Sequence, residues 1–327
     1  MKNHEYYLEK CLNLACKGFP NNRPNPMVGS VIVYKDKIIG EGYHEEYGSN
    51  HAEVNAINSV IDKSLLTKST IYVNLEPCSH FGKTPPCADL IIKHKIPKVV
   101  VGCIDTFSKV SGKGIQKMRN AGIEVITGVL NKESRDLNKR FFTFHEKKRP
   151  YIILKWAQTK NNFIANKKNE SKWISNNLSR QLVHKWRAHE DSILVGASTV
   201  EFDNPRLTVR KWIGKNPTRL VINPKNRLDN KKHIFNKSIK TINIQNINGG
   251  NLRKVISTLI KKKIGSIIIE GGSFTINKFI NNNLWDEMRI FYSKKTFKGG
   301  VSSPKFDNKT RNYKKILDDK LFILYNE

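Results

Sequence analysis

The sequence predicts an α/β protein with two domains, and three observations lead to this prediction. The chain has 327 residues, which is longer than most single hydrophobic cores. In both halves, short β-branched runs alternate with segments of helical period, which is the pattern of a layered α/β domain. A heavily charged stretch at residues 131–149 separates the two series and ends in Arg149-Pro150. We therefore expect one domain over residues 1–148 and a second over residues 149–327.

The first half contains a predicted hairpin followed by alternating helices and strands. Apolar residues at 28–33 and 38–40 flank the turn-like sequence YKDK, as in two strands joined by a tight turn. A helical stripe with the spacing of a buried face comes next, formed by Ala52, Ala56, Ile57, Val60 and Ile61. Strands are then predicted at residues 70–75 and 98–102, and helices at 88–92 and 115–120, the last closed by Gly122.

The second half restarts the same alternation. Strands are predicted at residues 151–154, 192–195, 219–222, 266–270 and 287–292. Helices are predicted at residues 179–187, 252–262 and 275–282. The sequence has no internal repeat, which excludes a solenoid architecture.

The chain is strongly basic, with 58 Lys and Arg against 28 Asp and Glu and a net charge of +30. A nucleic-acid-binding protein concentrates its charge in a patch interleaved with aromatic residues. Here lysine is spread along the whole chain together with Asn and Ile, the residues that A/T-rich codons encode. We therefore favour a bias in codon composition over a polyanionic partner, and keep deamination of a nucleic-acid base as an alternative.

Membrane and disulfide-rich classes are disfavoured. No apolar stretch is long enough to span a bilayer, and the first residues form no secretory signal, so we expect a cytoplasmic protein. Five cysteines in a chain of this length do not form a disulfide framework. Cys11, Cys16 and Cys103 lie among apolar neighbours and are interpreted as buried free thiols.

Two short motifs predict a catalytic zinc site. His51 precedes Glu53 at the start of the helical stripe, while Cys78 and Cys87 lie between a predicted strand and a predicted helix. A catalytic zinc keeps three protein ligands and leaves one position open, and one imidazole with two thiolates supplies those three. Cys87 would begin a helix, where the helix dipole favours the thiolate.

Glu53 distinguishes this site from a structural zinc site. A buried carboxylate beside zinc can take a proton from an attacking water and deliver it to a leaving amine. His-x-Glu followed by Pro-Cys and a later Cys is the signature of zinc-dependent nucleobase deaminases. A structural zinc would need a fourth ligand, and only His80 is placed to provide one.

The ten-residue segment from Cys78 to Cys87 (CSHFGKTPPC) resembles that of the bifunctional deaminase/reductase of riboflavin biosynthesis. The likeness extends to the sequences PNPMVG at residues 24–29, GEGYH at 40–44 and GSNHAE at 48–53. In the second half it covers LKWA at 154–157, VGASTV at 195–200, DNPRLTVR at 203–210 and EGGS at 270–273. The resemblance implies a cytidine-deaminase-like three-layer domain followed by a dihydrofolate-reductase-like α/β domain.

That family deaminates a diaminopyrimidinone ribosylamine phosphate and then reduces its ribosyl group to ribityl with NADPH. The resemblance therefore implies two cofactors, Zn²⁺ and NADPH, a small-molecule substrate and a homo-oligomeric enzyme. It places around the substrate of the first reaction Asn25, His44, His80, Lys83 and Asp105.

The resemblance also assigns residues of the reductase half. The residues implied to contact its substrate are Ser171, Arg187, Leu207, Arg210 and Glu270. Those implied to contact NADPH are Ala157, Trp173, Thr199, Asp203, Gly272, Ser273, Phe274 and Thr275. Lys155 and Asn161 are expected near the site of hydride transfer.

The most serious departure from the family pattern lies in one segment of the second half. The family's Ser-Leu-Asp-Gly is Thr159-Lys160-Asn161-Asn162 here, so an Asp has become Asn161 and a Gly has become Asn162. An Asn keeps hydrogen bonds and tolerates left-handed backbone angles, but a carboxylate is lost. Two interpretations stay open: a slower reductase, or a second domain that only stabilises the deaminase.

Overall fold

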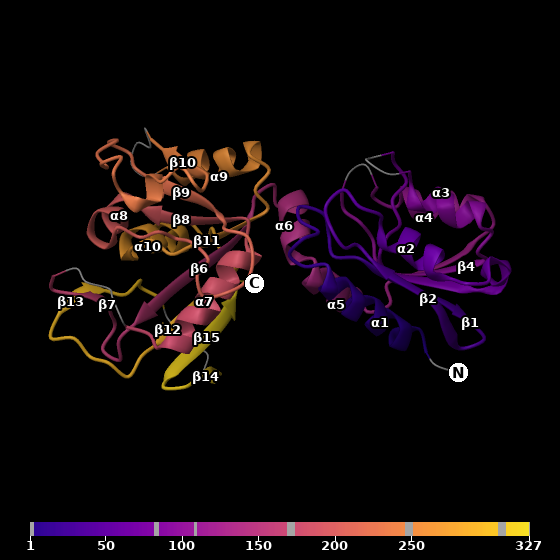
Figure 1. The fold of residues 1–327 in the computed structure, drawn as a ribbon, viewed down its shortest axis with the longest axis horizontal. Coiled ribbons are helices and arrows are strands. Elements are labelled where there is room, and N and C mark those ends of the chain that lie inside the picture. The colour runs from indigo at the N-terminus through magenta and orange to yellow at the C-terminus, as the bar shows by residue number, and fades with distance from the viewer. Residues whose placement is uncertain are drawn as a thin grey trace. The chain divides into compact units, whose positions relative to one another are not determined.

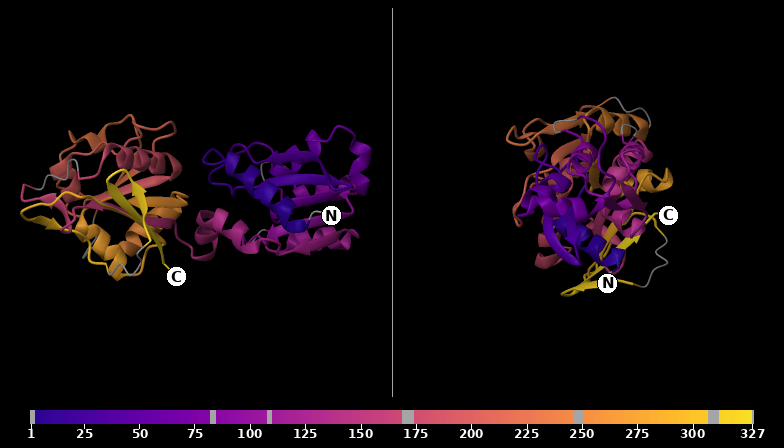
Figure 2. Two further views of the ribbon diagram at one scale, coloured as in Figure 1. Left: turned by 90° about the horizontal axis from the view of Figure 1, so that it is seen from below. Right: turned by 90° about the vertical axis from the view of Figure 1, so that its right-hand side faces the viewer.

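The computed structural model divides the chain into two compact units, Met1–Lys148 and Arg149–Glu327. It describes residues 3–81, 85–107, 110–168, 174–245, 251–306 and 312–326. Each unit is a sheet with helices on both faces (Figures 1 and 2). Within the described residues, no helix has the length and apolar character that crossing a membrane requires.

The N-terminal unit contains a five-stranded sheet in the order β2-β1-β3-β4-β5. The strands β1, β2 and β3 pair antiparallel, and β3, β4 and β5 pair parallel. The strands span β1 Gly29–Tyr34, β2 Lys37–Tyr43, β3 Thr70–Leu75, β4 Lys98–Cys103 and β5 Glu124–Thr127. The helices span α1 His4–Lys17, α2 Ala52–Ser59, α3 Cys87–Lys93, α4 Lys113–Asn120, α5 Asn131–Leu137 and α6 Lys139–Glu146.

Strict alternation along the strands divides this core into two layers. On β1, Val31 and Val33 face α1, while Ile32 between them faces α2. On β3 and β4 the same alternation continues, since successive side chains of a strand point to opposite faces. Helices α2, α3 and α4 therefore cover one face, and α1 and α5 the other (Figure 1).

The C-terminal unit has an eight-stranded sheet in the order β10-β9-β8-β11-β6-β12-β15-β14, which runs from top to bottom in Figure 1. The first six of these strands are parallel to one another. β15 pairs antiparallel with β12 on one side and with β14 on the other. The strands span β6 Tyr151–Gln158, β8 Ser192–Gly196, β9 Thr218–Ile222, β10 Thr241–Ile244, β11 Ser266–Ile269, β12 Glu287–Tyr292, β14 Lys314–Ile316 and β15 Asp319–Tyr325. A separate two-stranded sheet joins β7 Phe163–Asn166 to β13 Gly300–Ser302.

Four helices cover the two faces of the large sheet. Helices α9 Leu252–Lys261 and α10 Ser273–Asn281 pack on one face, against side chains such as Leu154 and Ile269. Helices α7 Asn177–His189 and α8 Ala197–Asp203 pack on the other. Most connections between the parallel strands run through α-helices, whereas β9 joins β10 through a loop with the short 3-10 helix His233–Phe235.

The structure confirms the predicted strands and helices to within a few residues and corrects two details. Ile61 is exposed, because α2 ends at Ser59 and the chain leaves the core after Val60. Cys16 is also exposed, whereas Cys11 and Cys103 are buried free thiols. The charged stretch before residue 149, for which the sequence predicted no elements, forms α5 and α6, which bury Ser134, Phe142 and Thr143.

One buried arginine holds the edge of the large sheet. Arg219 on β9 is 1% exposed, and its guanidinium donates to the carbonyl oxygens of Asn236 (2.6 Å), Ile239 (2.7 Å) and His233 (3.2 Å). It also donates to Thr241 Oγ1 on β10 (3.0 Å). Carbonyl dipoles thus replace a carboxylate partner and fix the β9–β10 connection.

We expect Arg219→Met to lower the free energy of unfolding by about 3 kcal/mol, because several buried carbonyl groups lose their donor at once. All five tryptophans lie beyond residue 150, so urea unfolding followed by tryptophan fluorescence reports on the C-terminal unit. The matched control is Arg227→Met, which removes an exposed ion pair to Glu201 and should cost under about 1 kcal/mol. Equal midpoints for the two variants would contradict this role for Arg219.

Candidate functional site

Three elements of the N-terminal unit bring His51, Cys78 and Cys87 together. His51 is the extended residue that precedes α2, Cys78 follows the end of β3, and Cys87 is the first residue of α3. Gly42 on β2 lets α2 approach the sheet, because a Cβ there would collide with the backbone of Ala56. The close packing of α2 against the sheet therefore fixes the position of His51.

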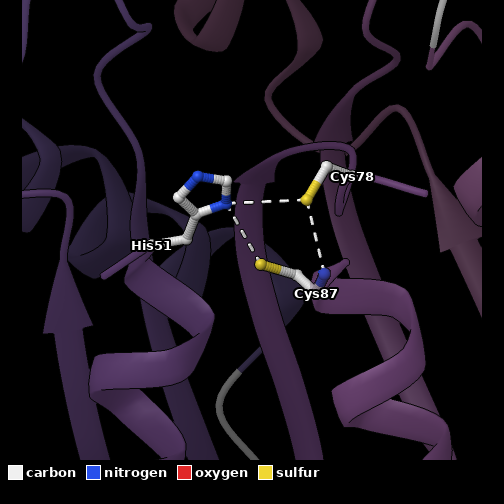
Figure 3. A group of neighbouring side chains, drawn as sticks. All are labelled: His51, Cys78 and Cys87. Carbon is white, nitrogen blue, oxygen red and sulfur yellow. Dashed lines mark hydrogen bonds between the residues drawn. The ribbon is translucent and has the colours of Figure 1, made fainter. Parts of the chain in front are cut away.

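The three ligand atoms face one another, as Figure 3 shows. His51 Nδ1 lies 3.2 Å from Cys87 Sγ and 3.5 Å from Cys78 Sγ, and Cys78 Sγ accepts a hydrogen bond from the Cys87 amide (3.3 Å). All three atoms lie within 4.8 Å of one another. This is the only such group of three among the residues that the structure describes.

The ionisation of the Cys78 thiol in this group of three favours the binding of a cation. Hydrogen bonds from the Cys87 thiol, His51 and the Cys87 amide lower the pKa of Cys78 to about 4. The pKa of Cys87 rises, because it gives its hydrogen bond to that thiolate and is itself buried. Two thiolates this close repel unless a cation lies between them, and one imidazole with two thiolates is a ligand set that zinc prefers.

Glu53 lies in the first turn of α2 and is 3% exposed. Burial raises the pKa of its carboxyl to about 7, and the neighbouring His51 opposes this rise. A carboxyl that changes its protonation state near neutral pH beside a metal site is suited to move protons during a reaction.

Asn25 and His44 form one hydrogen-bonded unit beside the metal ligands. His44 Nδ1 lies 3.0 Å from the Asn50 carbonyl, so this nitrogen carries the proton, and Nε2 accepts from Asn25 Nδ2 at 3.0 Å. The rings of His44 and His51 meet edge to face with centroids 5.5 Å apart. Burial lowers the pKa of His44, which favours this neutral form.

The segment that carries Asn25 is held by two asparagines that the sequence analysis missed. Asn138 accepts from the Met27 amide (2.7 Å) and donates to the Met27 carbonyl (2.9 Å). Asn74 donates to the same carbonyl (3.0 Å) and accepts from Gly29 (2.8 Å). No local sequence signal marks these residues, since their partners are backbone groups far along the chain.

Asp105 and His80 lie on the two loops that follow β4 and β3. Asp105 is buried, its pKa is raised to about 6 by burial, and it accepts from the Phe107 amide at 2.7 Å. The His80 ring contacts Phe107 with centroids 5.9 Å apart. Glu76, also missed, accepts from four backbone amides of Asp105, Gly112, Gly114 and Ile115. Lys83 lies outside the described residues.

The C-terminal unit contains a buried cluster of charges around Glu270. Arg187 on α7 donates two hydrogen bonds to the Glu270 carboxylate, of 3.0 and 2.7 Å, and Lys155 Nζ lies 3.7 Å from it. Although burial alone would raise it, the pKa of Glu270 lies at about 2 because Arg187 and Lys155 stabilise the carboxylate. Burial lowers the pKa of Lys155, and the same carboxylate opposes this.

His184, Leu207 and Arg210 lie beside this cluster. His184 accepts from the Arg210 amide at 3.1 Å, and burial with the neighbouring cations lowers the pKa of its ring to about 4. Leu207 is buried, and its positive φ of 54° marks a strained turn before the exposed Arg210. Ser171 lies outside the described residues.

The start of α10 forms an open anion cradle. Gly272 precedes the helix without a capping side chain and accepts from the Thr275 amide at 2.9 Å, so the first-turn amides of Ser273 and Phe274 are the ones that face outward from the helix end. The Gly272 amide donates to Thr199 Oγ1 on α8 at 2.8 Å. A Cβ on Gly271 would lie 2.7 Å from the Gly196 amide, so only glycine lets the two loops meet.

This cradle fits a dinucleotide phosphate, because uncapped helix N-termini beside glycine loops bind phosphate groups. Ala157 is the last residue but one of β6, and Asp203 is the last residue of α8, the helix that follows β8. Trp173 lies outside the described residues. Asn161 follows β6 and contacts the backbone of Phe297.

Comparisons with known proteins match both units of the chain. Residues 1–103 match the family model described as cytidine and deoxycytidylate deaminase zinc-binding region, and residues 150–309 match RibD C-terminal domain. The chain is 38% identical to riboflavin biosynthesis protein RibD of Aquifex aeolicus over 90% of this chain and 88% of that protein. It is 33% identical to RibD of Escherichia coli over 89% and 88%.

Solved structures give the same result. A diaminohydroxyphosphoribosylaminopyrimidine deaminase/5-amino-6-(5-phosphoribosylamino)uracil reductase from Thermotoga maritima superposes with a TM-score of 0.89, at 36% identity and 98% coverage of both chains. Acinetobacter baumannii RibD gives 0.87 at 30% identity, also with 98% coverage of both. The expected fold, a cytidine-deaminase-like unit followed by a dihydrofolate-reductase-like unit, is confirmed.

We expect Cys87→Ser to weaken zinc binding at least about 100-fold, because a hydroxyl replaces a thiolate ligand. Competition with a chromophoric chelator measures this affinity directly. Cys16→Ser is the control, since Cys16 is exposed and lies outside the ligand group, and it should keep the affinity of the unmodified protein. Unchanged zinc affinity in Cys87→Ser would contradict the ligand assignment.

Proposed function

Because the chain belongs to the riboflavin biosynthesis protein RibD family, we propose that its two units act in turn on one pyrimidine ribosylamine phosphate. It is a bifunctional enzyme, a zinc-dependent deaminase and an NADPH-dependent reductase. The first unit hydrolyses an amine from 2,5-diamino-6-(ribosylamino)pyrimidinone 5′-phosphate. The second reduces the ribosyl group to ribityl. The observation that supports this most is the His51, Cys78 and Cys87 group beside the buried Glu53.

In the deaminase, His51, Cys78 and Cys87 would hold zinc, which supplies a water molecule acidic enough to attack near neutral pH. Glu53 accepts a proton from that water as its oxygen bonds to the amine-bearing ring carbon. Glu53 then gives the proton to the amine as the carbon–nitrogen bond breaks, and ammonia leaves. The carboxyl pKa of about 7 suits both transfers.

Polar side chains around this centre would orient the pyrimidine phosphate. Asn25 and His44 form a fixed pair that can read the edge of the ring by hydrogen bonds. We assign Asp105 and His80 to the same substrate, and Lys83 to its phosphate, where an ammonium serves as a point charge.

In the reductase, the cradle formed by Thr199 and the residues from Gly272 to Thr275, with the Ser273 and Phe274 amides facing outward, would hold NADPH, which supplies the hydride. Ala157, Asp203 and Trp173 would complete its contacts. That hydride would go to the ribosyl carbon bonded to nitrogen, whose bond to the ring oxygen would break, so this oxygen needs a proton. We assign that proton to Lys155, a buried ammonium beside Glu270.

The substrate phosphate of this second reaction is assigned to Arg210. Arg187 already donates two hydrogen bonds to Glu270, so it serves mainly to orient that carboxylate toward the sugar. Arg210 is exposed and its guanidinium can bind a phosphate in bidentate fashion. Ser171 and Leu207 would line the remaining side of the sugar.

The substrate is a small molecule, and we propose a homo-oligomeric, cytoplasmic enzyme that does not act on nucleic acid. The nucleic-acid alternative leaves the whole C-terminal unit without a role. A merely stabilising second unit is disfavoured as well, because the buried Lys155, Arg187 and Glu270 cluster is complete.

We expect Glu53→Gln to reduce ammonia release at least about 100-fold, because the amide cannot shuttle a proton. Zinc content should remain near one per chain, and NADPH oxidation with already deaminated substrate should be unchanged. Ammonia assays and metal analysis on the same preparation measure both. Ammonia release within a few fold of the unmodified enzyme would exclude Glu53 as the proton carrier.

We expect Lys155→Met to reduce NADPH oxidation at least about 100-fold while ammonia release stays unchanged. The loss follows because a thioether cannot donate a proton to the sugar oxygen. Absorbance of NADPH measures the rate, and tryptophan fluorescence verifies that the C-terminal unit is folded. A folded variant that oxidises NADPH at the normal rate would refute the assignment.

A further inference from the structure

The side chain of Asn161 links the turn after β6 to the segment after β12. We propose that Asn161 is a positioning residue of the reductase and that its role requires a carboxamide rather than a carboxylate. The proposal rests on the reductase function proposed above. Under this proposal, Asn161 supports the reductase site, whereas the sequence analysis left open that it makes the reductase slower.

The carboxamide pairs with one peptide group in both directions. Asn161 Nδ2 donates to the Phe297 carbonyl at 2.8 Å, and Asn161 Oδ1 accepts from the Phe297 amide at 3.2 Å. Thr159 Oγ1 also donates to Oδ1, at 2.9 Å. The side chain thus behaves like a backbone peptide in a β-ladder, with one donor and one acceptor in use.

This contact spans a gap between two paired regions. The pairing of β6 with β12 ends at Gln158 and Tyr292, and that of β7 with β13 reaches Phe163 and Ser302. Backbone hydrogen bonds flank the gap, from Ser293 to Gln158 (2.9 Å), from Lys160 to Lys295 (2.8 Å) and from Ser303 to Asn162 (2.8 Å). Asn161 therefore continues the ladder where the two backbones no longer pair directly.

An aspartate could not replace this contact. An ionised carboxylate only accepts hydrogen bonds, so one of its oxygens would face the Phe297 carbonyl without a proton between them. The donated bond would be lost and two negative oxygens would be brought together. The donor and the acceptor of the Phe297 peptide group together therefore favour an amide side chain at this position.

The neighbouring Asn162 supports the same arrangement. Its φ is 64°, a left-handed angle that Asn tolerates in place of Gly. Its side chain accepts from Gln158 (2.7 Å), which in turn accepts from the buried Trp156 (2.6 Å). A chain of hydrogen bonds thus connects the turn to the interior of β6.

The position of this turn matters for the reaction because β6 carries Lys155 and Ala157. The parallel strands β8, β11, β6 and β12 end at one edge of the sheet, where such folds bind their ligands. Asn161 holds the ends of β6 and β12 together at that edge. A displacement of about 1 Å between reacting groups can reduce a rate by about 100-fold.

We expect Asn161→Asp and Asn161→Ala each to lower kcat for NADPH oxidation by roughly five- to tenfold, with the KM for NADPH unchanged within about twofold. Ammonia release by the same chain should not change. Lys160→Ala is the matched control, since it alters an exposed neighbour and keeps the backbone bond to Lys295. It should retain full kcat.

The possible outcomes distinguish the role of Asn161 from the reductase function itself. Asn161→Asp with a kcat equal to or above that of the unmodified enzyme would overturn the proposal and favour the weakened-site interpretation. A lowered unfolding midpoint in urea with unchanged kcat would also overturn it, by showing a purely structural role. If the unmodified enzyme itself failed to oxidise NADPH, the reductase function would be refuted first, and this inference with it.

Discussion

The arrangement of both sites depends on one constraint: parallel β-strands end at a common edge of their sheet. In the N-terminal unit, β3 leads to Cys78 and β4 leads to Asp105, so a metal ligand and a buried carboxyl meet there. In the C-terminal unit, β11 leads to Glu270 and β6 carries Lys155 beside it. Helices that begin at the same edge add their N-termini, which place Cys87 beside Cys78 and form an anion cradle at α10.

Side-chain amides fix the loops that leave these edges. Asn138 and Asn74 bind the backbone of Met27 in the first unit, and Asn161 binds that of Phe297 in the second. A loop lacks the regular ladder that satisfies its peptide groups, and an amide supplies a donor and an acceptor at once. The ligand-binding loops are thereby held in place without additional secondary structure.

The sequence predicts most of the fold because the buried strands are β-branched and the hairpin and helix ends carry clear turn signals. It predicts that His51, Cys78 and Cys87 come together, because their spacing is tied to a reaction. It misses β5, β7, β10, α8 and the C-terminal strands, which are short or carry lysines at exposed positions. It also misses Glu76 and Asn138, because a residue that binds distant backbone amides leaves no local pattern. The helical character of the charged stretch before residue 149 becomes clear only when Phe142 finds its partners in the core.

The charge cluster of the C-terminal unit carries the strongest argument for an intact second site. Two cations and one carboxylate are buried together there, at Lys155, Arg187 and Glu270. Removing such groups from water costs free energy that their mutual attraction only partly offsets, and apolar residues of similar size often stabilise a protein more. Folding stability alone therefore does not account for this cluster. The proposed sugar substrate, which needs a carboxylate held in place by Arg187 and a proton donor beside it, does account for the cluster, and we propose that the Asn161 contact holds the adjoining strand ends in register for that reaction.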